Sequence, residues 1–210
     1  MAGTMPHAIF IETELDEAGT VAAYAAELPG CATFAPSADE AASGMPARVN
    51  RFTAWLRQNG EAAPTFVGDN WYEVERASAD QAADPARRRA AFSLDELPPS
   101  NGEHGSWLRW LELAREELAE ALDAATDLGE AADLLGAIER QDVAFTRQLG
   151  GQAPELSDDP IDRLYAARDA LSSALEAAGP AADGVRRILR IAIADDLRAA
   201  DALRGGGARD

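Results

Sequence analysis

Residues 97–102 read Leu97-Pro98-Pro99-Ser100-Asn101-Gly102, a run that ends regular structure on both of its sides. Proline fixes its own backbone angle and lacks an N–H donor, and Asn-Gly favours a turn. Before this run, aromatic and β-branched residues alternate with polar ones, whereas after it Ala, Leu, Arg and Glu follow helical spacing. We therefore expect an α+β fold, with an α+β domain and its connector over residues 1–100. An all-α domain with a flexible C-terminal tail follows over residues 101–210.

The chain is strongly acidic, since its 210 residues carry 37 Asp or Glu against 19 basic residues, for a formal net charge of -18. Residues 1–100 hold 7 Arg and 15 acidic residues, and residues 101–210 hold 12 and 22. Phosphate binding needs a basic patch, so this charge argues against a nucleic-acid partner. It fits a basic protein partner, a small cationic ligand or solubility. The one basic run, Arg87-Arg88-Arg89, is short, and we interpret it as a solvated helix end.

Several chemistries lack the residues that they need. Two histidines, His7 and His104, exclude a three-His zinc site, and we expect both at flexible edges, which disfavours Ser-His-Asp catalysis. A single cysteine, Cys31, excludes an internal disulfide and every Cys-pair metal motif. The sequence shows neither a signal peptide nor a run of about 20 apolar residues. We therefore expect a cytoplasmic protein with no membrane contact.

The first half predicts the order ββ(β)αβ. The expected strands are residues 8–15, 20–27, 31–34, 66–67 and 71–74, with a helix over residues 38–59. Ser37 is the expected N-cap of that helix, with Glu40 at capping-box spacing. Gly44 and Pro46 predict a break or kink inside it.

One stretch of the first half resembles a known family. The run Tyr24-Ala25-Ala26-Glu27-Leu28-Pro29-Gly30-Cys31-Ala32-Thr33 is similar to the strand–Leu-Pro-Gly-Cys–strand core of the HicB-like antitoxin domain. The resemblance implies a small, partial ribonuclease-H-like sheet with one helix, without catalytic residues, that covers a small basic RNA-cutting toxin. Family members usually continue into a DNA-binding module, whereas nothing basic follows here.

Leu28, Pro29, Gly30 and Cys31 form either a tight turn with a buried thiol or a partner-binding edge. A reactive thiol at Cys31 is disfavoured, because the region is acidic and no cation lies nearby in sequence to lower the thiol pKa. Trp71 and Tyr72 are expected on an exposed strand edge, to which a partner strand could add.

The second half shows four apolar stripes at helical spacing, broken at Gly129, at Gly150-Gly151 and at Gly179-Pro180. Ser106 is the expected cap of the first helix, and Asp159-Pro160 the start of the third. Four amphipathic helices joined by turns indicate a four-helix bundle.

This bundle resembles the DinB-like family, through residues 135–145 and 185–203, and residues 91–99 resemble the connector of chains that pair the two domains. Metal-binding members carry one His on the second helix and two His, four apart, on the last. The corresponding residues here are Ala137 and Glu139 on the second helix and Asp195 and Ala199 on the last. The resemblance therefore implies a bundle that has lost its metal site, with no resident cofactor.

Polar residues nevertheless fall on the apolar stripes: Asp142, Arg168 and Asp195, with Asp196 as the rival of Asp195. Because burying a lone charge is costly, we expect Arg168 to pair with Asp142 or with Asp195 or Asp196, at the former metal position. A rotated helix face, a pocket for a cationic or hydroxylated ligand, and a Mg²⁺, Mn²⁺ or Ca²⁺ site built from Glu139, Asp142 and Asp195 are alternatives.

The sequence thus predicts a non-catalytic protein, monomeric or homodimeric, that binds a protein partner or a ligand. The alternative is a DinB-like metal- or thiol-dependent enzyme that uses a carboxylate site in the bundle.

Overall fold

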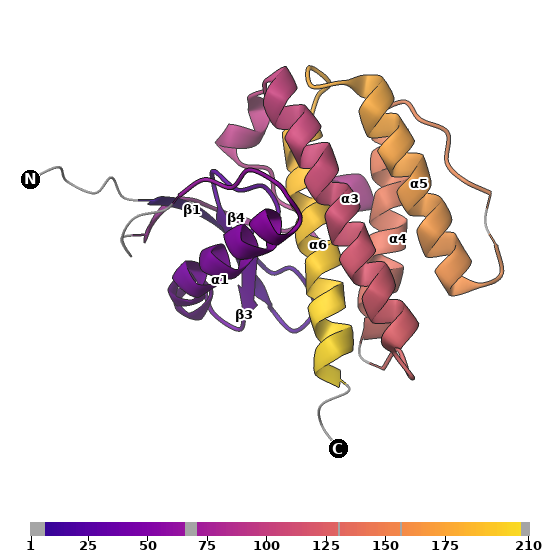
Figure 1. Cartoon of the computed structure of the whole chain (residues 1–210), viewed down its shortest axis with the longest axis horizontal. Coiled ribbons are helices and arrows are strands. Elements are labelled where there is room, and N and C mark those ends of the chain that lie inside the picture. The colour runs from indigo at the N-terminus through magenta and orange to yellow at the C-terminus, as the bar shows by residue number, and fades with distance from the viewer. Residues whose placement is uncertain (1–6, 66–70, 130, 156, 207–210) are drawn as a thin grey trace, which may run out of the picture. The chain divides into compact units, whose positions relative to one another are not determined.

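The computed structural model describes residues 7–65, 71–129, 131–155 and 157–206. The chain divides into two compact units, Met1–Leu97 and Pro98–Asp210. The first contains a sheet with one long helix, and the second contains four long helices (Figure 1). No helix of the described residues is long and apolar enough to cross a membrane.

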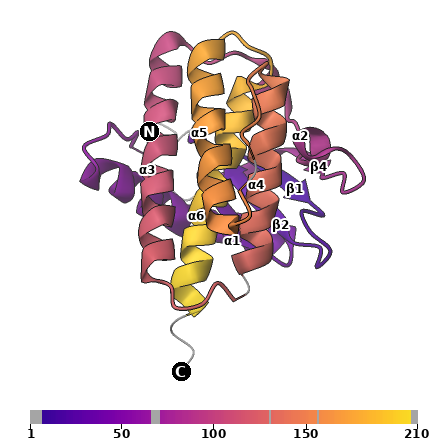
Figure 2. The same ribbon diagram turned by 90° about the vertical axis from the view of Figure 1, so that its right-hand side faces the viewer.

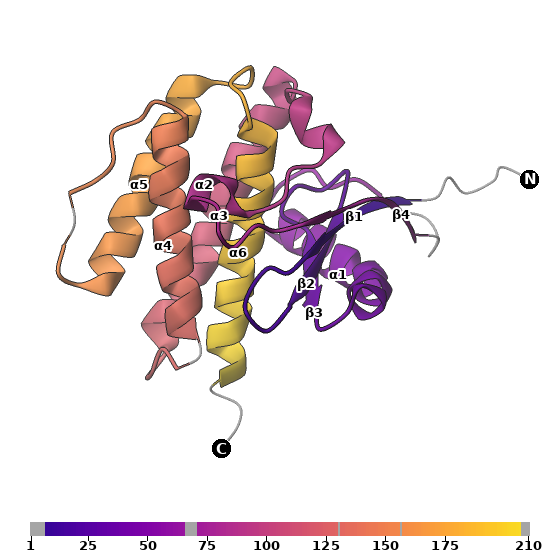
Figure 3. The same ribbon diagram turned by 180° about the vertical axis from the view of Figure 1, so that it is seen from behind.

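The sheet of the first unit has four strands in the order β3-β2-β1-β4 (Figure 3). They are β1 (His7–Thr13), β2 (Val21–Ala25), β3 (Ala32–Ala35) and β4 (Trp71–Ser78). The first three are joined by short connections and pair antiparallel. β4 pairs parallel to β1, which requires a long crossover that contains α1 (Ala38–Gln58). The α+β class and the element order agree with the sequence analysis, whereas Phe66 and Val67 lie outside the described residues.

Of the break or kink predicted in α1, the break is wrong, because the helix runs without interruption through Pro46. One face of α1 is buried along its whole length, at Ala41, Met45, Val49, Phe52, Thr53 and Leu56. Packing along that face offsets a proline cost of about 3 kcal/mol. Gly44 serves close approach rather than flexibility, since a Cβ there would lie 3.3 Å from Thr33 Cγ2 of β3. Ser37 caps the helix as expected, accepting from the Glu40 amide at 3.3 Å.

Residues after β4 complete the first unit. They form the single turn α2 (Pro85–Arg88) and the 3-10 helix η1 (Ser93–Glu96). Phe92 between them stacks on Phe10 of β1, with ring centroids 4.8 Å apart. This segment therefore belongs to the core of the first unit and is more than a linker.

The second unit is a bundle of α3 (Asn101–Ala124), α4 (Ala131–Gln148), α5 (Pro160–Ala178) and α6 (Val185–Gly206) (Figure 2). α6 packs against α3 and α4, and α4 also packs against α5. Hydrophobic residues from all four helices form a core cluster that includes Leu118, Leu135, Ile138, Leu164 and Leu203. Of the flexible tail expected over residues 205–210, Gly205 and Gly206 instead lie in α6, and residues 207–210 lie outside the described residues.

The start of the first bundle helix corrects one prediction. α3 begins at Asn101 and is capped by Ser100, not by Ser106. The Ser100 amide donates to Glu103 Oε2 at 2.8 Å, and the Glu103 amide donates to Ser100 Oγ at 3.2 Å, which is a capping box. His104 consequently lies within the helix and is 7 % exposed, not at a flexible edge. Asp159 caps α5 with Pro160 at its first position, as predicted.

Candidate functional site

Four charged side chains, one from each helix of the bundle, lie close to one another in ion pairs and hydrogen bonds. They are Arg115 of α3, Asp142 of α4, Arg168 of α5 and Asp196 of α6, which we call the charge cluster. Asp142, Arg168 and Asp196 are 2 to 3 % exposed. The Arg115 side chain is 14 % exposed.

Arg168 is the centre of the cluster. Its Nη2 donates a hydrogen bond to Asp196 Oδ1, and its Nε lies 4.0 Å from Asp142 Oδ2. The guanidinium therefore lies between carboxylates of two other helices. This is the ion pair that the sequence analysis expected, with Asp196 rather than Asp195 as the hydrogen-bonded partner.

Arg115 of α3 contacts cluster residues of both α5 and α6. Its Nη1 donates to the carbonyl oxygen of Arg168 at 2.7 Å and to Ser172 Oγ, and its Nε lies 3.8 Å from Asp196 Oδ2. Sequence reasoning missed Arg115, although it lies four residues after Leu111 and three before Leu118 on the buried stripe. The spacing rule that found Asp142 would also have found it.

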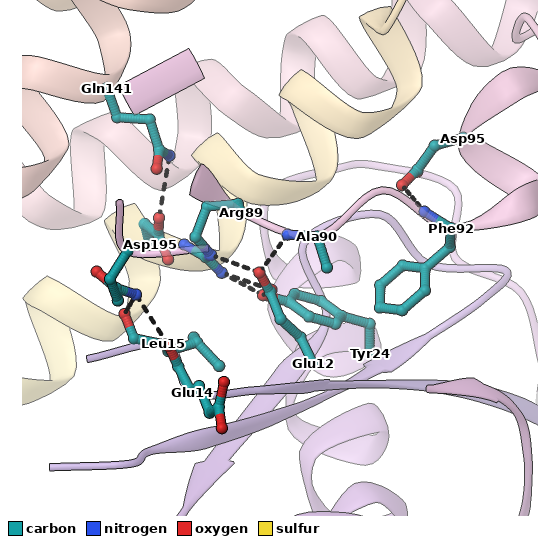
Figure 4. A network of polar contacts seen from close by, with 11 residues as sticks. Glu12, Glu14, Leu15, Tyr24, Arg89, Ala90, Phe92, Asp95, Gln141 and Asp195 are labelled. Atoms are coloured by element: carbon teal, nitrogen blue, oxygen red, sulfur yellow. Dashed lines mark hydrogen bonds and ion pairs between the residues drawn. The ribbon is translucent and has the colours of Figure 1, made fainter. Parts of the chain in front are cut away.

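The other two predicted residues lie apart from the ion pair. Asp195 Oδ2 accepts from Gln141 Nε2 at 3.3 Å (Figure 4), and both side chains are buried. Glu139 pairs with Arg163 at 3.3 Å on a part-buried flank of α4 and α5. The expected oxygen set of Glu139, Asp142 and Asp195 is therefore divided among three different partner groups.

Burial controls the protonation of the cluster. Loss of solvent raises the pKa of Asp142 to about 7, although the nearby Arg115 and Arg168 lower it in part. Burial also raises the pKa of Asp196, against the opposing effect of Arg168, and lowers the pKa of Arg115. Asp142 Oδ2 accepts no hydrogen bond from the described residues, so its charged form is poorly compensated.

The cluster does not fit the Mg²⁺, Mn²⁺ or Ca²⁺ site that the sequence analysis kept as an alternative. Hard divalent ions take six or more oxygen ligands, with carboxylates in their ionised form. Here guanidinium groups lie within 4.0 Å of both cluster carboxylates. No group of three or more potential metal ligands occurs among the described residues. We therefore derive no metal-dependent step from this site.

The turn in the first unit supports the buried-thiol interpretation. Leu28, Pro29, Gly30 and Cys31 are all buried, and the Cys31 amide donates to the Leu28 carbonyl at 2.9 Å. Gly30 has φ +84°, a conformation that favours glycine. Burial raises the pKa of the Cys31 thiol to about 12. These four residues offer no accessible edge, whereas Tyr72 of β4 is 47 % exposed and Trp71 is half-buried beside His7.

A second buried ion pair occurs in the first unit, and the sequence analysis missed it. Glu12 of β1 is fully buried and accepts from Arg89 Nε at 3.1 Å, from the Ala90 amide at 2.6 Å and from Tyr24 Oη at 2.9 Å (Figure 4). Arg89 is 6 % exposed, so the prediction of a solvated basic run is wrong at this residue. α2 ends at Arg88, and the extended backbone of Arg89 directs its side chain to the sheet.

Comparison of the chain with protein-family models, with curated proteins and with solved structures finds no match. The HicB-like and DinB-like resemblances therefore rest on the quoted motifs. The arguments about function below rest on geometry and charge.

Proposed function

We propose that this chain is a non-catalytic binding protein, a HicB-like unit joined to a DinB-like bundle that has exchanged its metal centre for an internal ion-pair cluster. The observation that carries this proposal is the position of Arg168, whose guanidinium lies between Asp142 and Asp196. The fixed positive charge of Arg168 takes the place of a cation between the two carboxyl groups.

Electrostatics support the exchange. A divalent ion at this position would have to displace at least one guanidinium from a site that is closed to solvent. Burial also raises the pKa of Asp142 and Asp196, so that both carboxyls favour a proton more than they do in water. Carboxylates that bind a metal need the opposite tendency, because they bind it in the ionised form.

The expected partner is a basic protein. The first unit holds 15 acidic residues against 7 Arg, and long-range attraction raises the rate at which a basic partner is met. The HicB-like resemblance favours the same chemistry of partner.

The alternative is an enzyme that uses a carboxylate of the bundle. One observation favours it, since the pKa of Asp142 is about 7 and such a group can exchange a proton near neutral pH. If the enzyme is metal-dependent, it should contain bound metal, whereas the non-catalytic binding protein should contain none.

The test is elemental analysis of the tag-free full chain after dialysis against Mn²⁺, Zn²⁺ or Ni²⁺, with Asp142→Asn and Asp133→Asn as paired variants. Asp133 lies on the exposed face of the same helix and controls for adventitious carboxylate binding. We expect substoichiometric metal in all three proteins. One equivalent of metal that Asp142→Asn removes and Asp133→Asn retains would overturn the proposal and support the enzyme.

A further inference from the structure

β4 is an outer strand of the sheet, with β1 on its inner side. Four large hydrophobic side chains of the described residues are exposed, and two of them, Tyr72 at 47 % and Val74 at 49 %, lie on this strand. An outer strand with exposed apolar side chains is a template for pairing with another strand. The sequence of β4 indicates which strand would fit.

The pairing of β4 with β1 contains a bulge. Ile9 is opposite Glu73 and Phe10 is opposite Glu75, so that Val74 is an extra residue. On a regular strand, residues three apart point to opposite faces. Because of the bulge, Glu73 and Arg76 lie on the same face of the sheet, where their cross-strand partners on β1 are Ile9 and Ile11. The side chains of Glu73 and Arg76 form a 2.7 Å ion pair.

This shared face makes the strand complementary to itself. In a two-fold antiparallel pair, residue i of one copy is opposite residue j of the other, and j is opposite i. Both members of such a pair must point to the same face of the joined sheet. A two-fold axis between Val74 and Glu75 satisfies this condition for Glu73 with Arg76, Tyr72 with Ala77 and Trp71 with Ser78.

We propose that β4 pairs antiparallel with β4 of a second copy of this chain, which joins two four-stranded sheets into one. Glu73 of each copy is then opposite Arg76 of the other, and opposite charges directly across a strand pair are favourable. Val74, the extra residue of one copy, is then opposite Glu75 of the other copy. The residues on either side of the two bulges therefore remain paired one to one. A regular eight-residue strand centred in the same way would place each of these pairs on opposite faces.

The association is weak for two reasons. One pair of strands covers less surface than a standard protein interface. The formal net charge of -18 on each chain also opposes association. This inference does not depend on the proposed function, and it makes the outer edge of β4 a self-association surface instead of a site for a basic partner strand.

Sedimentation velocity of the full chain over a concentration series tests the proposal, at about 0.15 M salt, where the Debye length is about 8 Å. The wild-type chain is expected to show a reversible monomer–dimer equilibrium. Arg76→Glu or Glu73→Arg alone places like charges opposite each other twice and should weaken the dimer about tenfold. The double swap, Glu73→Arg with Arg76→Glu, should restore it.

The chain offers a matched control. Arg109 and Glu112 of α3 form an exposed ion pair at 3.0 Å, with both side chains about half exposed. The substitutions Arg109→Glu and Glu112→Arg change the net charge by the same amounts as the β4 variants and should leave the dimer unchanged. Circular dichroism of each variant checks that it is folded.

Cysteine pairing tests the register directly. Tyr72→Cys with Ala77→Cys in one chain should give a covalent dimer under a mild thiol oxidant, because directly opposite residues lie within disulfide reach. Tyr72→Cys alone should give none, and the native Cys31 is buried. A monomer at every concentration, a dimer that the double swap does not restore, or a failure of the paired cysteines to cross-link would each overturn the proposal.

Discussion

Replacing Asp142 by asparagine should stabilise the chain, and the gain should grow with pH. Asparagine keeps the shape of the protonated carboxyl and removes only the ability to ionise. The folded pKa of Asp142 is about 7, against 3.8 for the free group. Each pKa unit corresponds to about 1.4 kcal/mol, so the buried charge costs up to roughly 4 kcal/mol at high pH.

The sign follows from proton linkage. Because the folded pKa of Asp142 is raised, its favourable contribution is complete below its unfolded pKa and is lost as pH rises through about 7. The wild-type chain should therefore lose stability from about pH 4 to about pH 7 through this group, whereas Asp142→Asn should not. Between about pH 5.5 and about pH 8, the advantage of the variant should grow by about 2 kcal/mol.

Urea unfolding at these two pH values measures the difference, and both lie above the isoelectric point of 4.4, where the chain is less soluble. Asp133→Asn, at an exposed position of α4, controls for the chemical change. An advantage that is the same at both pH values would refute the reasoning. A variant that is less stable than the wild type at the higher pH would show that the ionised Asp142 is held by Arg168 and Arg115.

Three further predictions concern the buried groups. Arg168→Ala should lower the melting temperature through a loss of about 3–5 kcal/mol, because it leaves Asp196 buried without its hydrogen-bonded partner, and an unchanged melting temperature would mean that the pair is absent. Glu12→Gln should destabilise the first unit by several kcal/mol and speed proteolysis between residues 84 and 97, and a protease-resistant variant would contradict the role given to Arg89. Cys31 should react with an alkylating reagent only after unfolding, since it is buried and its pKa is about 12, which timed labelling in buffer and in urea would show.

Local chemistry predicted much of the fold. Asp159-Pro160 marked a helix start because a side-chain cap and a proline at the first position act within one turn. The choice of Ser106 over Ser100 failed because it followed the apolar stripe beginning at Trp107. Glu103, three residues after Ser100, was the better signal, since it completes a capping box.

The candidate site was predictable where periodicity decided it. Asp142 and Arg168 were found because each interrupts a helical apolar stripe, and a charge on a buried face needs a partner. The choice between Asp195 and Asp196 depended on one residue of helix rotation, which spacing does not resolve. Arg89 was not predictable, because its partner Glu12 lies 77 residues earlier in the sequence and only the tertiary fold joins them.

The pairing of Glu12 with residues 89 and 90 sets an order of events for a chain that emerges from the ribosome. Once residues 1–80 have been made, β1, β2, β3 and β4 are present, yet the carboxylate of Glu12 near the end of β1 has neither the Arg89 guanidinium nor the Ala90 amide. Closing the sheet then would bury an uncompensated charge, so the nascent sheet is held back until roughly ten further residues are available. The first unit can thus fold only after the segment that follows β4 has been synthesised. A fragment that stops before Arg89 should remain unfolded although it contains β1, β2, β3 and β4.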